Sequence, residues 1–315
     1  MSPASAIEVD FPDIEPWAAG NTGVPYVWRF AAPAGGPRVL VQALTHGNEV
    51  CGAVVLDELL RAGFRPERGS LTLVFANARA YGSFDTAEPY ASRCVDEDFN
   101  RLWDDGHLDA ARDSVELARA RALRPFYDET QFLLDLHSMT DPCLPLALAG
   151  RHPKGVALAR AIGMPEHIVV DEGHRAGKRL RDYAFFDDPD DPRAALLVEC
   201  GQHWERAAPD VARRVTLRFL RRFRMLPQAW LRDEDDAPPV PQRVIEVTQA
   251  VTIQTDDFAF LRPVQGLLVI PQRGTVLARD GPRLLRTPYD GCVLIMPTRR
   301  PRRGETAVRL GRFVA

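Results

Sequence analysis

The chain has 315 residues, of which 45% are hydrophobic and 26% are charged, and its formal net charge at neutral pH is -3. This composition is typical of a folded globular protein, and so low a net charge provides no overall attraction to nucleic acid or to anionic lipid. No apolar run is long enough for a membrane-spanning helix, and the first residues carry Asp and Glu where a secretory signal has a basic segment.

The first two-thirds of the chain alternates short apolar runs with helical patterns, for example at 50–62. The runs are rich in β-branched residues and cover 38–44, 70–77, 131–137, 167–170 and 194–199. Apolar strands bounded on both sides by helices predict a buried sheet whose strands are mainly parallel. We therefore predict an α/β fold with a mainly parallel mixed sheet flanked by helices.

The composition changes after a helical pattern at about 209–226. Residues 232–242 combine acidic residues with prolines, which cannot continue a helix, and predict a linker. Short strands separated by Gly, Pro and Asp turns follow and predict a smaller all-β domain that resembles a barrel-sandwich. This part contains no lysine, which excludes the carrier function of that fold. The predicted domains are therefore 1–231, with the catalytic residues, and 243–315.

Two candidate metal ligands lie at one strand-to-helix turn. The segment LTHGNEV places His46 at the end of a strand and Glu49 at the start of a helix. Gly47 lets the backbone turn tightly between them, and an imidazole with a carboxylate is a ligand pair that zinc accepts. The alternative is a loop histidine beside a glutamate that caps the helix.

Two later strands end in polar residues at the same edge of the predicted sheet. QFLLDLH ends in His137, a third candidate ligand, and strand alternation places Asp135 on the same face, where it could orient an imidazole. AALLVE delivers Glu199 into an apolar setting, where a buried charge needs a reason. A general base beside an activated water is such a reason, and a salt bridge to an arginine is the alternative.

A polar loop, SRCVDEDFNRLW, supplies Arg93, Asp98, Asn100 and Arg101, and arginine side chains bind carboxylates in two-point fashion. With this loop, the chain resembles the succinylglutamate desuccinylase and aspartoacylase family, which is related to the zinc carboxypeptidases. The motifs are His46-Gly-Asn-Glu49, Asp98-Phe-Asn100-Arg101, Asp135-Leu-His137 and Val-Glu199. They follow the order of the family.

The resemblance implies a role for each motif residue. One Zn²⁺ per chain would be held by His46, Glu49 and His137, and Glu199 would be the general base and proton shuttle. Asn100 and Arg101 would grip the substrate carboxylate, and Arg93 would stabilise the tetrahedral oxyanion together with zinc. The implied reaction is hydrolysis of a small N-acyl amino acid that bears a carboxylate. Aspartoacylase, succinylglutamate desuccinylase and diamino-acid deacetylase types all remain open.

Several basic or histidine-containing segments are left outside the predicted site. Arg179 and Arg181 are candidates for binding the substrate side chain, but the acidic run that follows them favours a solvated loop. The RRPRR run at 299–303 is interpreted as a surface loop, and His203 as a packing residue. The arginines between 213 and 224 occur at helical spacing and predict a solvated helix, not a nucleic-acid surface.

Two other functions stay open on the sequence. A metallocarboxypeptidase would act on peptides, and a non-catalytic zinc-binding protein would retain only the fold. The five cysteines lack CxxC spacing, which favours reduced thiols and a cytoplasmic location. We expect no nucleic-acid or membrane partner, and the sequence leaves association into homo-oligomers open.

Overall fold

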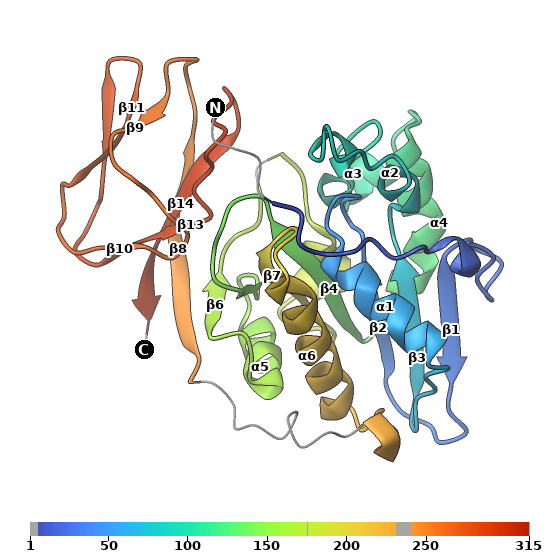
Figure 1. Ribbon diagram of the computed structural model, residues 1–315. Coiled ribbons are helices and arrows are strands. Elements are labelled where there is room, and N and C mark those ends of the chain that lie inside the picture. The colour runs from blue at the N-terminus through green and yellow to red at the C-terminus, as the bar shows by residue number, and fades with distance from the viewer. Residues whose placement is uncertain (1–5, 175, 231–240, 315) are drawn as a thin grey trace.

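An eleven-stranded mixed sheet runs through the computed structural model, which describes residues 6–174, 176–230 and 241–314 (Figure 1). In sheet order, its strands are β1 (Val27–Ala31), β3 (Ser70–Phe75), β2 (Arg38–Ala43), β4 (Phe132–Met139), β7 (Ala194–Gln202), β5 (Leu146–Leu148), β6 (His167–Val170), β8 (Arg243–Thr252), β14 (Thr306–Val314), β13 (Cys292–Ile295) and β10 (Val269–Ile270). The predicted α/β architecture is confirmed.

The centre of this sheet is parallel. Strands β3, β2, β4 and β7 pair in parallel, so their carboxyl ends lie at one edge of the sheet. β1 is antiparallel to β3 at one side, and β5 reverses direction against β7 at the other. The central strands are buried on both faces, which explains why they read as nearly continuous apolar runs.

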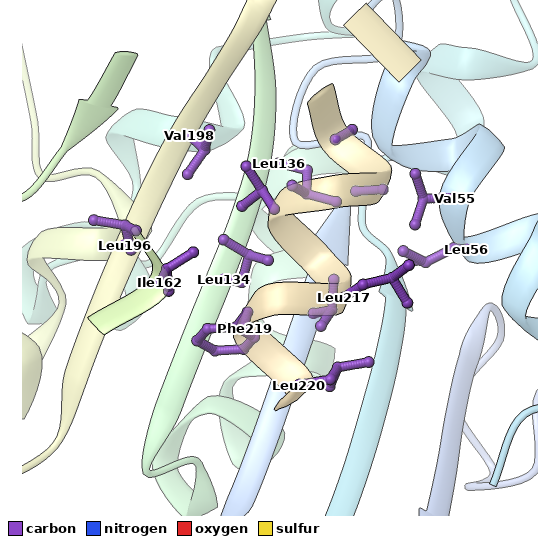
Figure 2. Close-up of a cluster of buried hydrophobic side chains, with 14 of the residues drawn as sticks. Val55, Leu56, Leu134, Leu136, Ile162, Leu196, Val198, Leu217, Phe219 and Leu220 are labelled. Carbon is purple, nitrogen blue, oxygen red and sulfur yellow. The ribbon is translucent and has the colours of Figure 1, made fainter. Parts of the chain in front are cut away.

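Helices cover both faces of the parallel strands. The helices are α1 (Cys51–Arg61), α2 (Ala78–Tyr81), α3 (Asp105–Leu108), α4 (Val115–Glu129), α5 (Pro153–Ile162) and α6 (Ala207–Arg222). Helices α1, α5 and α6 share one hydrophobic core, which includes Leu134, Leu196 and Phe219 (Figure 2). Helices α3 and α4 belong to a second core on the other face. Across the three described segments, no helix has the length and apolar character needed to cross a membrane.

Short 3-10 turns complete the loops between these elements. They are η1 (Glu15–Trp17), η2 (Ala91–Arg93), η3 (Phe99–Arg101), η4 (Leu180–Asp182), η5 (Ala184–Asp187) and η6 (Gln228–Trp230). Two of them, η2 and η3, lie in the polar loop that the sequence analysis singled out. The polar loop therefore contains two short helical turns, with residues 94–98 between them in neither helix nor strand.

The C-terminal strands join the main sheet directly. β8 pairs in parallel with β6 and antiparallel with β14, and a second sheet of β9 (Ala259–Phe260), β11 (Val276–Asp280) and β12 (Arg283–Arg286) lies beyond them. The all-β character of this part is confirmed. The division at 231 and 243 stays a prediction, because most of the predicted linker at 232–242 lies outside the described residues.

Close packing of α1 on the sheet depends on a glycine. A Cβ atom on Gly52 would lie 2.8 Å from Ala43 Cβ and 2.9 Å from Leu136 Cβ. We expect Gly52→Ala to lower the free energy of unfolding by about 1–3 kcal/mol, because the overpacked helix must move off the sheet. Thermal and urea unfolding would measure this loss.

Gly82→Ala is the matched control for that substitution. Gly82 has a φ of -65°, and its added Cβ would have contacts no closer than 3.5 Å. It should leave stability unchanged or raise it slightly, since alanine reduces the freedom of the unfolded chain. Equal losses in both variants would contradict the packing argument.

Candidate active site

A cavity of about 560 Å³ lies at the carboxyl ends of the central parallel strands. His46 follows β2, whereas His137 and Glu199 lie within the last residues of β4 and β7. The lining of the cavity contains the seven residues to which the sequence analysis gave a role, namely His46, Glu49, Arg93, Asn100, Arg101, His137 and Glu199. Parallel strands of this kind direct their carboxyl-end residues into one crevice, which is where such folds bind ligands.

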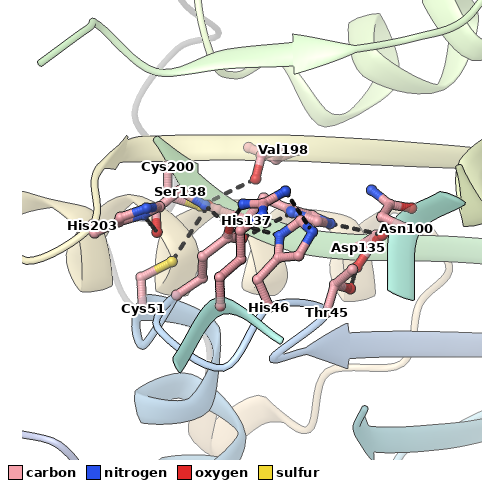
Figure 3. A network of polar contacts seen from close by, with 12 residues as sticks. Thr45, His46, Cys51, Asn100, Asp135, His137, Ser138, Val198, Cys200 and His203 are labelled. Atoms are coloured by element: carbon pink, nitrogen blue, oxygen red, sulfur yellow. Dashed lines mark hydrogen bonds and ion pairs between the residues drawn. The ribbon is translucent and has the colours of Figure 1, made fainter. Parts of the chain in front are cut away.

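Three buried side chains in this cavity are arranged as a set of metal ligands (Figure 3). Glu49 stands between two imidazoles: its Oε1 lies 2.7 Å from His46 Nδ1, and its Oε2 lies 2.8 Å from His137 Nδ1. One donor atom from each of the three residues falls within 4.8 Å of the others. Two histidine nitrogens and one carboxylate form a donor set that suits zinc and leaves room for a water.

The other nitrogen of each imidazole lies beside a second carboxylate. His46 Nε2 lies 3.0 Å from Asp98 Oδ1, and His137 Nε2 lies 2.9 Å from Asp135 Oδ2. Carboxylates in this position fix the ring orientation and direct the free nitrogen toward a metal. Both histidines therefore present Nδ1 to the same point.

Asp135 is itself held by neighbouring polar groups. Its Oδ1 accepts hydrogen bonds from Thr45 Oγ1 at 2.8 Å and from Gln42 Nε2 at 3.1 Å. These three side chains are buried, so the interaction is protected from water. The sequence analysis predicted the orienting role of Asp135 for an imidazole but not its two partners.

The charges of the cluster suit a cation at its centre. Burial raises the pKa of Glu49, but His46 and His137 outweigh that effect and hold it well below its ordinary value. Burial lowers the pKa of His137, yet Asp135 and Glu49 raise it well above the ordinary value. Positive charge at the centre of the cluster therefore stabilises its carboxylates. A divalent cation fits the same position.

Gly47 keeps the His46 turn close to two other segments. A Cβ atom at this position would lie 2.4 Å from both the carbonyl carbon of Ala80 and the carbonyl oxygen of Ser92. The backbone of Gly47 also donates to the carbonyl of Arg93 at 3.1 Å. The glycine was predicted to serve a tight turn, and the structure adds a steric requirement for close backbone approach.

Glu199 faces the cluster from the neighbouring strand. It is the register partner of His137 in the parallel pairing of β4 with β7, and it is buried. Among the described residues, its Oε2 has no hydrogen-bond partner. Burial raises the pKa of Glu199 to about 8, and the negative charge of Glu49 adds to this shift. A carboxylate with such a pKa can exchange a proton near neutral pH.

The polar loop places Arg93 and Arg101 on either side of Asp98. Arg93 Nη2 lies 3.0 Å from Asp98 Oδ2, and Arg93 Nη1 lies 3.6 Å from Glu49 Oε1. Arg101 is farther from Asp98, at 3.8 Å, and donates to the backbone carbonyl of Asn100. Asn100 Oδ1 in turn accepts a hydrogen bond from the backbone of Leu180. The loop is therefore anchored to the segment that follows His174.

The prediction of a solvated loop around Arg179 and Arg181 was wrong. Arg179 and Arg181 are both buried, and Arg179 lines the cavity. Arg179 pairs with Asp171 at 2.6 Å and with Asp182 at 2.9 Å, while Arg181 also contacts Asp182. Carboxylates next to these arginines in sequence neutralise them inside the protein, whereas the acidic run suggested that they faced water.

The C-terminal strands supply residues that the sequence analysis missed. Arg309 of β14 lines the cavity, as do Arg300 and Arg302, so the RRPRR run is not simply a surface loop. The guanidinium of Arg300 stacks at 3.4 Å from the ring centroid of Tyr90. No local motif distinguishes Arg309 from other arginines, and only the pairing of β8 with β6 brings β14 to the cavity.

His203 lies behind the cluster and does not line the cavity. Its Nδ1 lies 2.9 Å from Ser138 Oγ, its Nε2 lies 3.2 Å from Thr140 Oγ1, and its ring packs against Trp204. Burial lowers the pKa of His203 to about 4. These contacts agree with the packing role inferred from the sequence.

Comparison with known proteins identifies the family. Residues 35–217 match the succinylglutamate desuccinylase/aspartoacylase catalytic domain, and the chain belongs to that family. A probable aspartoacylase of Parasynechococcus marenigrum is 33% identical over 158 residues, which cover 44% of this chain and 48% of that relative. The chain thus aligns with about half of that relative's length.

Two further relatives cover more of the chain. A succinylglutamate desuccinylase of Pseudoalteromonas atlantica is 23% identical over 300 residues, which cover 86% of this chain and 79% of the relative. The crystal structure of a succinylglutamate desuccinylase from Vibrio cholerae matches with a TM-score of 0.64 at 19% identity and covers 91% of this chain and 85% of that one. The fold therefore extends over the catalytic part and the C-terminal strands together.

The contact between Asp135 and His137 predicts an effect on metal affinity. We expect Asp135→Asn to weaken zinc binding by about 10–100-fold, because the amide no longer fixes the imidazole and its proton. Competition with a chelator of known affinity would measure the change. Asp280→Asn is the control: Asp280 accepts hydrogen bonds from Gln254 and Thr255 in the C-terminal part. Equal losses in both variants would refute the orienting role.

Proposed function

We propose that this protein is a zinc-dependent deacylase that hydrolyses the amide bond of a small N-acyl amino acid. The observation that carries the proposal is the buried cluster of His46, Glu49 and His137 with the free carboxylate oxygen of Glu199 facing it. Metal ligands alone would suit a structural site. A buried carboxylate with an unused oxygen and a raised pKa is what a hydrolytic reaction needs beside them.

Each residue has a separate task in the proposed mechanism. His46, Glu49 and His137 would hold the zinc, which when bound lowers the pKa of a water and polarises the amide carbonyl. Glu199 would accept a proton from the attacking water as the oxygen of this water bonds to the carbonyl carbon. Arg93 would donate to the oxygen that becomes negative. Glu199 would then pass its proton to the amine nitrogen as the C–N bond breaks, leaving a carboxylic acid and a free amino acid.

The cavity wall opposite Glu199 supports an acidic substrate. Arg101 lies 3.8 Å from Asp98, which is already held by His46 and Arg93 at 3.0 Å. Burial lowers the pKa of Arg101 to about 10, and the nearby arginines add to this effect. Arg101 is therefore only weakly neutralised. Together with Asn100, it would receive one substrate carboxylate.

Arg309 would receive a second anionic group. Its Nε approaches Asp171 only to 3.9 Å, and Asp171 is already engaged by Arg179. Burial lowers the pKa of Arg309, and the positive charge of Arg179 opposes its protonation further. The same arginines and burial hold the pKa of His174 at about 3, so this imidazole adds no charge. A dianionic substrate would relieve the surplus of positive charge.

The shape of the cavity favours a small substrate over a peptide. The loop before β14 lines the same cavity as the catalytic cluster through Met296, Thr298, Arg300 and Arg302. Arg300 is fixed there by its contact with Tyr90. A metallocarboxypeptidase needs a groove for the chain that precedes the scissile bond. We therefore place the carboxypeptidase second, and the non-catalytic zinc protein third, since the latter gives Glu199 no task.

The test is zinc content together with turnover of a panel of amides. The panel is N-acetylaspartate, N-succinylglutamate, acetylated diamino acids and a C-terminal dipeptide. We expect one zinc per chain and hydrolysis of an acidic N-acyl amino acid. Turnover of the dipeptide alone would replace the proposal with a carboxypeptidase. A protein that binds no zinc and stays inactive in its presence would refute both.

Glu199→Gln tests the proton transfer within that reaction. The amide keeps the shape of the side chain but cannot accept a proton from water, so kcat should fall by on the order of 10² or more while KM and zinc content stay unchanged. Isothermal titration with zinc and steady-state kinetics would separate these effects. A parallel loss of zinc would show that Glu199 is a ligand or a structural residue instead.

Arg309→Ala tests the second anionic group. KM for a substrate with two carboxylates should rise by about 10-fold or more, because a buried charged hydrogen bond is lost, and kcat should change little. Arg312→Ala is the control on the same strand, since Arg312 is exposed and pairs with Glu246. An unchanged KM in Arg309→Ala, or equal changes in both variants, would remove Arg309 from the substrate site.

A further inference from the structure

A buried carboxylate outside the cavity contacts the polar loop at three successive residues. Glu116, in the first turn of α4, is 0% exposed. Its Oε1 accepts from the backbone of Val95 at 2.6 Å, and its Oε2 accepts from the backbones of Asp96 at 3.0 Å and Glu97 at 3.2 Å. A charge in a hydrophobic core is costly unless it is hydrogen-bonded in this way. If the loop left this conformation, the buried carboxylate of Glu116 would lose these three donors. The side chain therefore stabilises the loop in the conformation described.

The contacted segment lies between the functional residues of the loop. Arg93 ends η2 two residues before it, and Asp98 begins the turn that carries Asn100 and Arg101 immediately after it. Residues on both sides are thus fixed relative to one carboxylate. The cavity lining does not include Glu116, so this side chain acts on the site through the groups that it binds.

Side chains of the loop also accept hydrogen bonds from residues at the start of α4. Asp96 Oδ2 accepts from the backbone of Val115 at 2.7 Å, while Glu97 accepts from Ser114 Oγ and from Arg112. Ser114 also caps the helix through the backbone of Leu117. Three carboxylates therefore gather at the positive end of a 15-residue helix, where its dipole favours negative charge. Loop and helix hold each other in place.

A second contact links Glu116 to the His46 turn. Asn77 Nδ2 donates to Glu116 Oε1 at 2.9 Å, and the backbone of Asn77 donates to the carbonyl of Leu44, two residues before His46. The loop itself accepts a hydrogen bond from Gly47 through the carbonyl of Arg93. One carboxylate thus connects the turn that carries two proposed ligands with the loop that carries Arg93.

We infer that Glu116 is a positioning residue that fixes Arg93 and the Asp98–Arg101 turn against the metal cluster. The catalytic part of this inference rests on the proposed function, whereas the structural part does not. A misplacement of about 1 Å at reacting groups can lower a rate on the order of 10²-fold. Rigidity of the loop is therefore a requirement for turnover and not only for stability.

Glu116→Gln is the test variant, because it replaces one of the two acceptor oxygens with an NH2 group. This group is a donor and cannot accept hydrogen bonds from the backbone N–H groups of the loop. Hydrogen exchange of the amides of residues 95–97 should be accelerated about tenfold or more relative to those of β4. In the same protein, kcat should fall on the order of 10-fold or more, well below the unfolding temperature. Leu123→Ala, a cavity variant in the buried face of α4, is the stability control and should lower the Tm with kcat unchanged.

Asp96→Asn is the second variant, for the case in which Glu116→Gln fails to fold. It weakens the reciprocal half of the contact from an exposed side chain, so it should show smaller changes of the same kind. Its control is Asp113→Asn, since Asp113 is 94% exposed beside the same helix end. Accelerated exchange without a loss of kcat would make Glu116 purely structural and overturn the inference. Unchanged exchange would overturn it whether or not the wild-type protein hydrolyses the proposed substrates.

Discussion

The carboxylate of Glu49 and its two imidazoles impose the constraint that organises the surrounding structure. Three ionisable groups share a buried space in which unbalanced charge is very costly. Each histidine therefore needs a carboxylate on its far nitrogen, and each of those carboxylates needs donors of its own. Asp98 obtains them from Arg93 and Arg101, and Asp135 obtains them from Thr45 and Gln42. The buried polar contacts around the cluster therefore form successive layers about Glu49.

A parallel sheet is well suited to supply such a cluster. Its central strands bring His46, His137 and Glu199 to the same edge from segments more than 50 residues apart, and helices on both faces keep water away from the strands. The register of β4 with β7 places His137 directly opposite Glu199. The order of the strands in the sheet thus determines the order of these groups along its edge.

The sequence predicted those parts of the site that depend on local pattern. Apolar runs that end in His137 or Glu199 are visible without any knowledge of distant segments, and so is the short spacing between His46 and Glu49. Strand and helix types were predicted for the same reason, because the buried central strands have a strong apolar signal.

The parts that were missed depend on contacts that only the folded chain makes. Arg179 looked solvated because acidic residues surround it in sequence, yet Asp171 and Asp182 neutralise it inside the fold. Arg309 had no motif at all, and only the pairing of β8 with β6 and with β14 brings it to the cavity. In each case the deciding partner is set by strand pairing or by loop packing, which a local pattern does not encode.

Because β8 pairs directly with β6, the cavity combines residues from two separate parts of the chain. The proposed machinery for bond cleavage is encoded before residue 200, whereas the wall that carries Arg309 is encoded after residue 242. In the proposed function, a mutation in the late part would change the subsite for the second anionic group and leave the three metal ligands and Glu199 in place. Asn100 and Arg101, which would receive the first carboxylate, lie in the early part, so the two ends of an acidic substrate would be recognised by separate stretches of the gene.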